Sequence, residues 1–131
     1  MSALYLDSSA FVKLVVEEAE TAALRSFLAN RDARRVSSAL LRTESLRAVR
    51  HLGPEALATV REGLRRVDLI GMDDRILDAA GTLAPQVLRT LDAIHLATAL
   101  AVGDDLEAIV TYDERMIEAA RLLGLPMATP R

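Results

Sequence analysis

The 131-residue sequence contains no cysteine. This absence excludes disulfide bonds and thiolate metal ligands, and it is typical of proteins in a reducing compartment. The first residues lack the basic flank and the apolar run of a signal peptide, and no apolar stretch is long enough to span a bilayer. We therefore expect a cytoplasmic protein without a membrane segment.

Aromatic residues are also scarce, at 3% of the chain, whereas hydrophobic residues make up 51%. The core must therefore be built from aliphatic side chains, and an extended aromatic surface for stacking single-stranded nucleic acid is excluded. A chain of this length suffices for one domain with its own core, which we expect to span residues 1–131.

Lysine is almost absent, because Lys13 is the only lysine among the 16 basic residues. The others are arginines, whose guanidinium groups suit paired contacts with phosphate. The formal net charge is −3 at pH 7, but the chain would be slightly positive without the four acidic residues discussed below. The overall charge therefore does not exclude a nucleic acid as partner.

Short apolar segments alternate with amphipathic ones along the chain. We expect strands at about residues 3–6, 35–38, 67–70, 108–111 and 127–129. We expect helices from Ser8 or Ser9 to about 17, and at about 19–31, 39–51, 54–66, 73–83, 91–102 and 114–123, with Asp73 and Thr90 as candidate N-caps. This alternation predicts an α/β fold, a parallel sheet flanked by helices in an α/β/α sandwich.

Two aspartates come just after predicted strands. Asp7 directly follows the first strand, and Asp113 lies two residues beyond the strand that ends at Thr111. In open α/β sheets, ligands bind outside the carboxyl ends of the strands, so both acids lie where sites form. Each could instead be only a turn residue or a helix cap, a common position for aspartate.

Glu44 is a carboxylate on an apolar helix face. At 100° per residue it falls within an arc of helix 39–51 formed by Leu40, Leu41, Ala48, Val49 and Leu52. A carboxylate that faces a core is costly unless it is paired or bound to a cation. The alternative is a salt bridge at the edge of the core.

Asp92 begins a helix, residues 91–102, that is apolar nearly all round and is therefore expected to be buried. Its few polar residues, Asp92, His95 and Thr98, are spaced three apart and share one face. Asp92 could serve only to offset the helix dipole. His95 could be a metal ligand, a donor to Asp92 or a satisfied core histidine, and we favour the last two together because hard-ion sites prefer oxygen.

Converging carboxylates repel one another and become protonated unless cations lie between them. Oxygen ligands without thiolates favour hard ions, so we expect Mg²⁺ or Mn²⁺ at a site formed by Asp7, Glu44, Asp92 and Asp113.

Four segments resemble PIN-domain ribonucleases, and among them the VapC-type toxins of toxin–antitoxin modules. They are Tyr-Leu-Asp-Ser-Ser-Ala-Phe-Val-Lys-Leu at 5–14, Ser-Ser-Ala-Leu-Leu-Arg-Thr-Glu at 37–44, Leu-Arg-Thr-Leu-Asp-Ala-Ile-His-Leu-Ala-Thr-Ala at 88–99, and Ile-Val-Thr-Tyr-Asp-Glu-Arg-Met at 109–116. Their order and spacing suit the family over essentially the whole chain.

The resemblance implies a parallel sheet with four acids at one end that hold one or two Mg²⁺ or Mn²⁺ ions. By position these are Asp7, Glu44, Asp92 and Asp113, and Ser9 and Thr111 match hydroxyl groups that support them. It also implies RNA as substrate, a homodimer, and a small antitoxin protein that blocks the site. The reaction would be phosphodiester hydrolysis by a metal-activated water, the chemistry of the toxin of a type II toxin–antitoxin pair.

Two other classes of protein compete with this interpretation. A phosphoacceptor signalling domain also has acids at strand ends, but it needs a lysine late in the chain, and Lys13 is early. A non-catalytic PIN-like interaction module would keep the fold without the chemistry, but it would not need a glutamate within an apolar arc.

Arginines gather on two neighbouring predicted helices, 39–51 and 54–66. We hypothesise that part of a surface formed by Arg34, Arg35, Arg42, Arg47, Arg50, Arg61, Arg65 and Arg66 contacts RNA phosphates. The alternative is an ordinary solvated helix face.

Overall fold

The computed structural model describes residues 1–85 and 88–131. Its strands are β1 (Ala3–Leu6), β2 (Arg34–Ser38), β3 (Asp68–Ile70), β4 (Leu106–Val110) and β5 (Met127–Ala128). Its α-helices are α1 (Ser8–Val15), α2 (Thr21–Ala29), α3 (Leu40–Val49), α4 (Pro54–Leu64), α5 (Asp74–Gly81), α6 (Thr90–Val102) and α7 (Glu114–Leu122), with 3-10 turns η1 (Arg50–Leu52) and η2 (Gly103–Asp105). The predicted alternation of strands and helices is confirmed.

All strand pairs are parallel, in the order β3-β2-β1-β4-β5. From β1 the chain builds outward to β2 and β3, then crosses back to place β4 on the other side of β1. The strand order therefore reverses between β1 and β4. In open parallel sheets, this reversal opens the crevice in which ligands bind.

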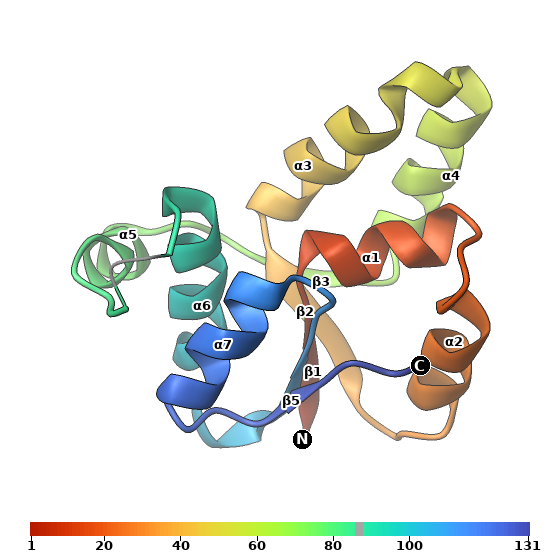
Figure 1. Ribbon diagram of the computed structural model, residues 1–131. Coiled ribbons are helices and arrows are strands. Elements are labelled where there is room, and N and C mark those ends of the chain that lie inside the picture. Colours follow the sequence, from red (N-terminus) through yellow and green to blue (C-terminus); the bar gives the residue numbers. More distant parts are fainter. Residues whose placement is uncertain (86–87) are drawn as a thin grey trace.

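The central strand β1 is buried on both faces of the sheet (Figure 1). Leu4 and Leu6 pack into a core with α1, α2, α3 and α4, while Ala3 and Tyr5 pack on the opposite face against α6 and α7. Alternate side chains of a strand point to opposite faces, so this short apolar segment supplies both cores. The sheet is thus covered by helices on both sides, as predicted.

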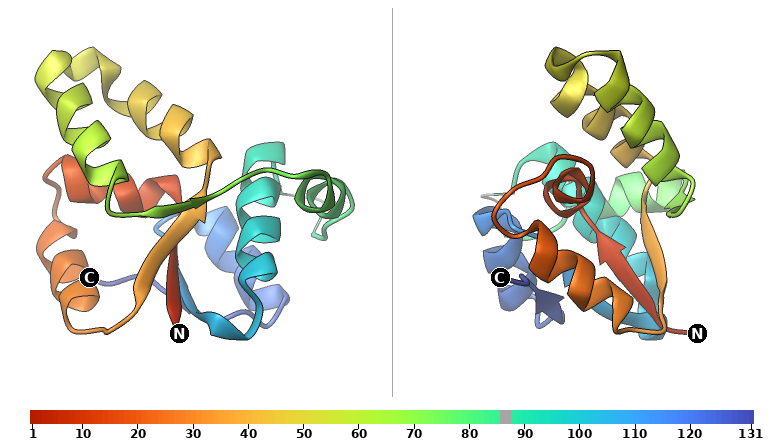
Figure 2. Two further views of the ribbon diagram at one scale, coloured as in Figure 1. Left: turned by 180° about the vertical axis from the view of Figure 1, so that it is seen from behind. Right: turned by 90° about the vertical axis from the view of Figure 1, so that its right-hand side faces the viewer.

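Helices α3 and α4 form a hairpin that projects beyond the carboxyl edge of the sheet (Figures 1 and 2). At Gly63 a Cβ atom would lie only 3.1 Å from the ring of Phe11, so glycine lets α4 approach α1 closely. Because the hairpin projects, Ala48 and Leu52 are exposed, and only Leu41 and Val49 of the expected arc are buried. The expected apolar arc is therefore too wide.

The helix caps differ from two of the expectations. Asp7, rather than Ser8 or Ser9, is the N-cap of α1, and α6 begins after Arg89 without a side-chain cap from Thr90. Asp73 caps α5 as predicted, accepting a hydrogen bond from the Ile76 N–H. In the described ranges 1–85 and 88–131, no helix is long and apolar enough to cross a membrane.

Candidate active site

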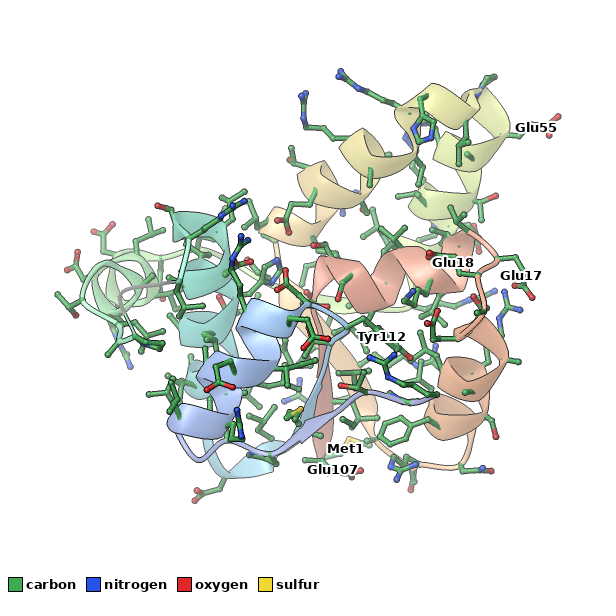
Figure 3. All side chains as sticks on the ribbon, in the orientation of Figure 1. Met1, Glu17, Glu18, Glu55, Glu107 and Tyr112 are labelled. Carbon is green, nitrogen blue, oxygen red and sulfur yellow. The ribbon has the colours of Figure 1, made fainter. Side chains whose placement is uncertain are left out.

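The four candidate acids come from elements that meet at the carboxyl edge of the sheet. Asp7 and Asp113 follow β1 and β4, and Glu44 lies on the helix after β2. Helix α6 leads into the start of β4, so its first turn, with Asp92, lies at the same edge. In Figure 3, Tyr112 marks this edge beneath α1, whereas Met1 and Glu107 mark the opposite edge.

Asp7 is held rigidly and is only 3% exposed. Its Oδ1 accepts hydrogen bonds from the Ser9 hydroxyl at 2.7 Å and from the Ala10 N–H at 3.0 Å, and its Oδ2 accepts one from the Thr111 hydroxyl. Burial raises the pKa of Asp7 above its usual range, although these three hydrogen bonds act in the opposite direction. The two hydroxyl groups predicted to support the acids therefore both bind Asp7.

Asp113 is connected to Asp7 through Thr111. The Thr111 oxygen accepts from the Asp113 N–H at 3.1 Å while its hydroxyl donates to Asp7. The Asp113 carboxylate caps α7, accepting from the N–H groups of Arg115 at 2.8 Å and Met116 at 3.3 Å. Asp113 is a helix cap, which was the alternative to a role in a site. It also lies at the reversal point of the sheet, so the two roles do not exclude one another.

Asp92 is half-buried in the first turn of α6. Partial burial and, next, the negative charge of Asp113 raise its pKa above the usual range, and the charge of Glu44 acts in the same direction. His95 and Arg115 act in the opposite direction. The structure thus brings Asp92, Asp113 and Glu44 close enough for their charges to interact.

His95 does not bind Asp92, and that expectation is wrong. Its Nε2 lies 2.5 Å from Glu44 Oε1, and its Nδ1 lies 2.7 Å from the Tyr5 hydroxyl oxygen. Asp92 and His95 share a helix face, but His95 points across to α3. The prediction of a satisfied core histidine is confirmed, because the ring is 2% exposed and both nitrogens have partners.

The family model of the PIN domain matches residues 4–122 of this chain. Ribonuclease VapC46 of Mycobacterium tuberculosis is 52% identical to it over 99% of both chains. Ribonuclease VapC35 of the same species is 43% identical over 97% of this chain and 96% of its own. The chain belongs to the VapC-type PIN-domain ribonucleases.

Solved structures share the fold of this PIN domain. A toxin–antitoxin complex from Klebsiella pneumoniae contains a chain with a TM-score of 0.74 and 22% identity, covering 99% of this chain and 98% of that one. VapC20 of Mycobacterium tuberculosis, described as a toxin that cleaves the sarcin–ricin loop, has a TM-score of 0.74 and 15% identity over 88% of this chain and 94% of its own. At these identities the likeness concerns the fold alone.

Sequence reasoning missed two residues near the acids of this PIN domain. Arg115 is exposed in the first turn of α7, and its positive charge acts to lower the pKa of Asp92. Tyr5 lies within a buried strand and looks like core in the sequence, but its hydroxyl binds His95. The position of Arg115 two residues after Asp113 was a usable signal, whereas nothing in the sequence indicates the partner of Tyr5.

Among the described residues of this PIN domain, no three acid or histidine side chains converge closely enough to share one cation. Asp7 and Asp113 are turned toward hydroxyl and backbone N–H donors, and Glu44 is turned toward His95. The donor chemistry nevertheless fits a hard divalent ion, because the set consists of carboxylates and the pKa values of two of them are raised. A nearby cation would favour the ionised form of these acids.

Proposed function

We propose that this protein is a metal-dependent endoribonuclease that hydrolyses RNA phosphodiester bonds. The observation that carries the proposal is the buried carboxylate of Asp7, fixed by three hydrogen bonds where the strand order reverses. Holding a negative charge there costs folding free energy, and the capping of α1 by Asp7 does not require the charge, because asparagine is an equally good N-cap. The relative VapC46 is a ribonuclease, which supports RNA as the substrate of this protein.

We propose that Asp7, Glu44, Asp92 and Asp113 hold Mg²⁺ or Mn²⁺. When bound, such an ion activates water for attack and offsets the charge that develops on the phosphate. The residues of the chain supply rigidity: Ser9 and Thr111 fix both oxygens of Asp7, and the start of α7 fixes Asp113. Arg115 is placed to contact the phosphate, because it is exposed beside Asp92 and carries the opposite charge.

The products of cleavage test this mechanism chemically. Water attacks in place of the neighbouring 2′-hydroxyl, so we expect fragments without 2′,3′-cyclic phosphate when the purified protein cuts RNA in Mn²⁺. The alternative is a non-catalytic PIN-like interaction module, which agrees with the finding that no three described acids or histidines converge. Such a module would leave RNA intact.

We propose that the chain acts in the cytoplasm as the toxin of a type II toxin–antitoxin pair, inhibited by a small antitoxin protein, and that it forms a homodimer. The structural relatives support a toxin–antitoxin role, since one is part of a toxin–antitoxin complex. The exposed side chains of Leu77 on α5 and Leu91 on α6 offer apolar surface for the second copy.

The structure divides the arginines that we expected on one RNA-binding surface. Arg34 and Arg35 begin β2 at the amino edge, opposite the acids, and Arg34 pairs with Asp68. Arg42, Arg47 and Arg50 are exposed on α3 and η1, in the projecting hairpin that also carries Glu44. Arg61 on α4 and Arg65 and Arg66 just after it are also exposed, and Arg65 pairs with Glu62. Because Arg42, Arg47 and Arg50 share α3 and η1 with Glu44, we propose that this group binds RNA that enters the acidic site.

We expect the double variant Arg47→Glu and Arg50→Glu to bind RNA at least about tenfold more weakly and to lower the salt slope by about two. Binding to an uncleaved RNA in EDTA over a range of salt concentrations measures both quantities. The matched control is Arg31→Glu with Arg34→Glu, which makes the same charge change at the amino edge. Equal losses of affinity in both double variants would mean that only the net charge matters, and would refute a specific role of the hairpin in binding RNA.

A further inference from the structure

We propose that Tyr5 and His95 are positioning residues that hold the carboxylate of Glu44 in the orientation needed to bind a cation. The inference rests on the proposed function of Glu44 as a metal ligand. The three side chains come from β1, α6 and α3, and they form one continuous hydrogen-bonded chain from the interior of the protein to the acidic site.

Burial makes this chain rigid at its inner end. Tyr5 is fully buried, and His95 is 2% exposed, whereas the side chain of Glu44 is 19% exposed. The rings of Tyr5 and His95 meet edge to face, with centroids 5.8 Å apart and an interplanar angle of 79°. This packing leaves the imidazole little freedom to turn, so the position of its Nε2 is fixed by the core.

The direction of the hydrogen bonds follows from the chemistry of the three groups. A carboxylate that binds a cation can only accept hydrogen bonds, so the proposal requires His95 Nε2 to carry the proton that points to Glu44 Oε1. The Tyr5 phenol has one proton to donate, and its oxygen lies 2.7 Å from His95 Nδ1, so it can donate to that nitrogen. Tyr5 thus favours the tautomer in which Nε2 is the donor.

Glu44 needs such support because of where it lies. Helix α3 packs mainly on α1 and α4, in the projecting hairpin, while α6 packs mainly on α5 and the sheet. The bond between Glu44 and His95 therefore connects the hairpin to the body of the protein at the acidic site. Without it, a partly exposed glutamate would sample several rotamers, and ordering them on binding a cation costs free energy.

The competing explanation is that His95 is only a core residue whose polar atoms happen to be satisfied. The two explanations differ in what a substitution should do. A glutamine at position 95 can keep an N–H donor near the position of Nε2, whereas a leucine fills the space and removes the donor. If positioning matters, the two variants should differ in activity even when they are equally stable.

The first test determines which ring nitrogen of His95 carries the proton in the metal-free protein. The chain has only two histidines, and the other, His51, is exposed on η1, so it serves as an internal reference. In a long-range ¹H–¹⁵N spectrum at neutral pH, we expect His95 to carry its proton on Nε2 with Nδ1 unprotonated. A proton on Nδ1 with Nε2 bare would overturn the proposal. This result does not depend on whether the protein cleaves RNA.

The second test measures cleavage in Mn²⁺. We expect His95→Leu and Tyr5→Phe to lower kcat by about 10- to 100-fold with little change in KM, the usual effect of losing support for a metal ligand. His95→Gln should recover most of the kcat lost in His95→Leu. The matched control is Tyr112→Phe, which also removes one phenol hydroxyl but breaks only a hydrogen bond to the Pro130 carbonyl, so it should keep kcat.

Equal kcat values for His95→Gln and His95→Leu would overturn the positioning role. So would a loss of kcat in all variants that simply follows their melting temperatures. If the parent protein cuts no RNA, the proposed function fails, while the tautomer in the first test still decides whether the hydrogen-bonded chain exists as described.

Discussion

Asp7→Asn is expected to lower the rate of RNA cleavage by at least about a hundredfold, since a lost metal ligand removes several kcal/mol of charge stabilisation and each 1.4 kcal/mol is tenfold in rate. The amide keeps the shape of the site. Its oxygen can accept from Ser9 and the Ala10 N–H, its nitrogen can face the Thr111 oxygen, and asparagine is as good an N-cap as aspartate. The loss of activity should therefore not come from unfolding.

The same variant should melt at an unchanged or higher temperature without metal. Burial raises the pKa of Asp7, so between the usual aspartate range and this raised value the folded protein binds more protons than the unfolded chain. The free energy of unfolding then falls as pH rises through this window. Asp92 has a raised pKa and acts in the same direction. Asp7→Asn should remove much of this dependence, and melting curves from pH 4 to 8 measure it.

Asp73→Asn is the matched control, because it makes the same substitution at the N-cap of α5, which the proposal does not involve. It should leave both cleavage and the pH dependence of melting unchanged. If Asp7→Asn melted well below the parent and still cut RNA, Asp7 would be a structural cap and the proposed site would be wrong.

Chelation should strongly inhibit cleavage. We expect excess EDTA to lower the rate by at least about a hundredfold, because hydrolysis by water then loses the several kcal/mol that a cation supplies. Excess Mg²⁺ or Mn²⁺ should restore the rate, since carboxylate oxygens are the ligands these ions prefer. The measurement is the initial rate on a labelled RNA before chelation, in EDTA, and after the metal is returned. RNA that is cut equally well in EDTA would refute the metal mechanism.

The order of the elements and the edge on which the acids lie were predictable from the sequence. Both follow from local patterns: apolar strands alternate with amphipathic helices, and the carboxyl ends of parallel strands share one edge. Asp7 and Asp113 could be placed because Asp7 directly follows β1 and Asp113 lies shortly after β4. The sequence did not separate a cap from a site residue, and the structure shows why, since both aspartates cap a helix at the reversal point.

The partners of the side chains were not predictable in the same way. Helical spacing put His95 on the face of Asp92, yet the imidazole binds Glu44 on another helix, because which helices face one another is decided by tertiary packing. Likewise, the helical wheel counted Ala48 as core, but α3 projects from the body and leaves it exposed. A wheel describes one helix and contains no information about what lies opposite.

The central claim is that the four acids act as one metal site. The most direct test is the melting temperature with and without Mn²⁺, measured for three proteins: the parent, Asp92→Asn and Glu107→Gln. A ligand that binds only the folded state stabilises it, so saturating Mn²⁺ should raise the melting temperature of the parent by roughly 5 °C or more. Asp92→Asn should lose most of this shift together with RNA cleavage. Glu107→Gln, which removes an exposed charge at the opposite edge, should keep both. Equal Mn²⁺ shifts in all three proteins, or an Asp92→Asn variant that cuts RNA at the parent rate, would contradict the account.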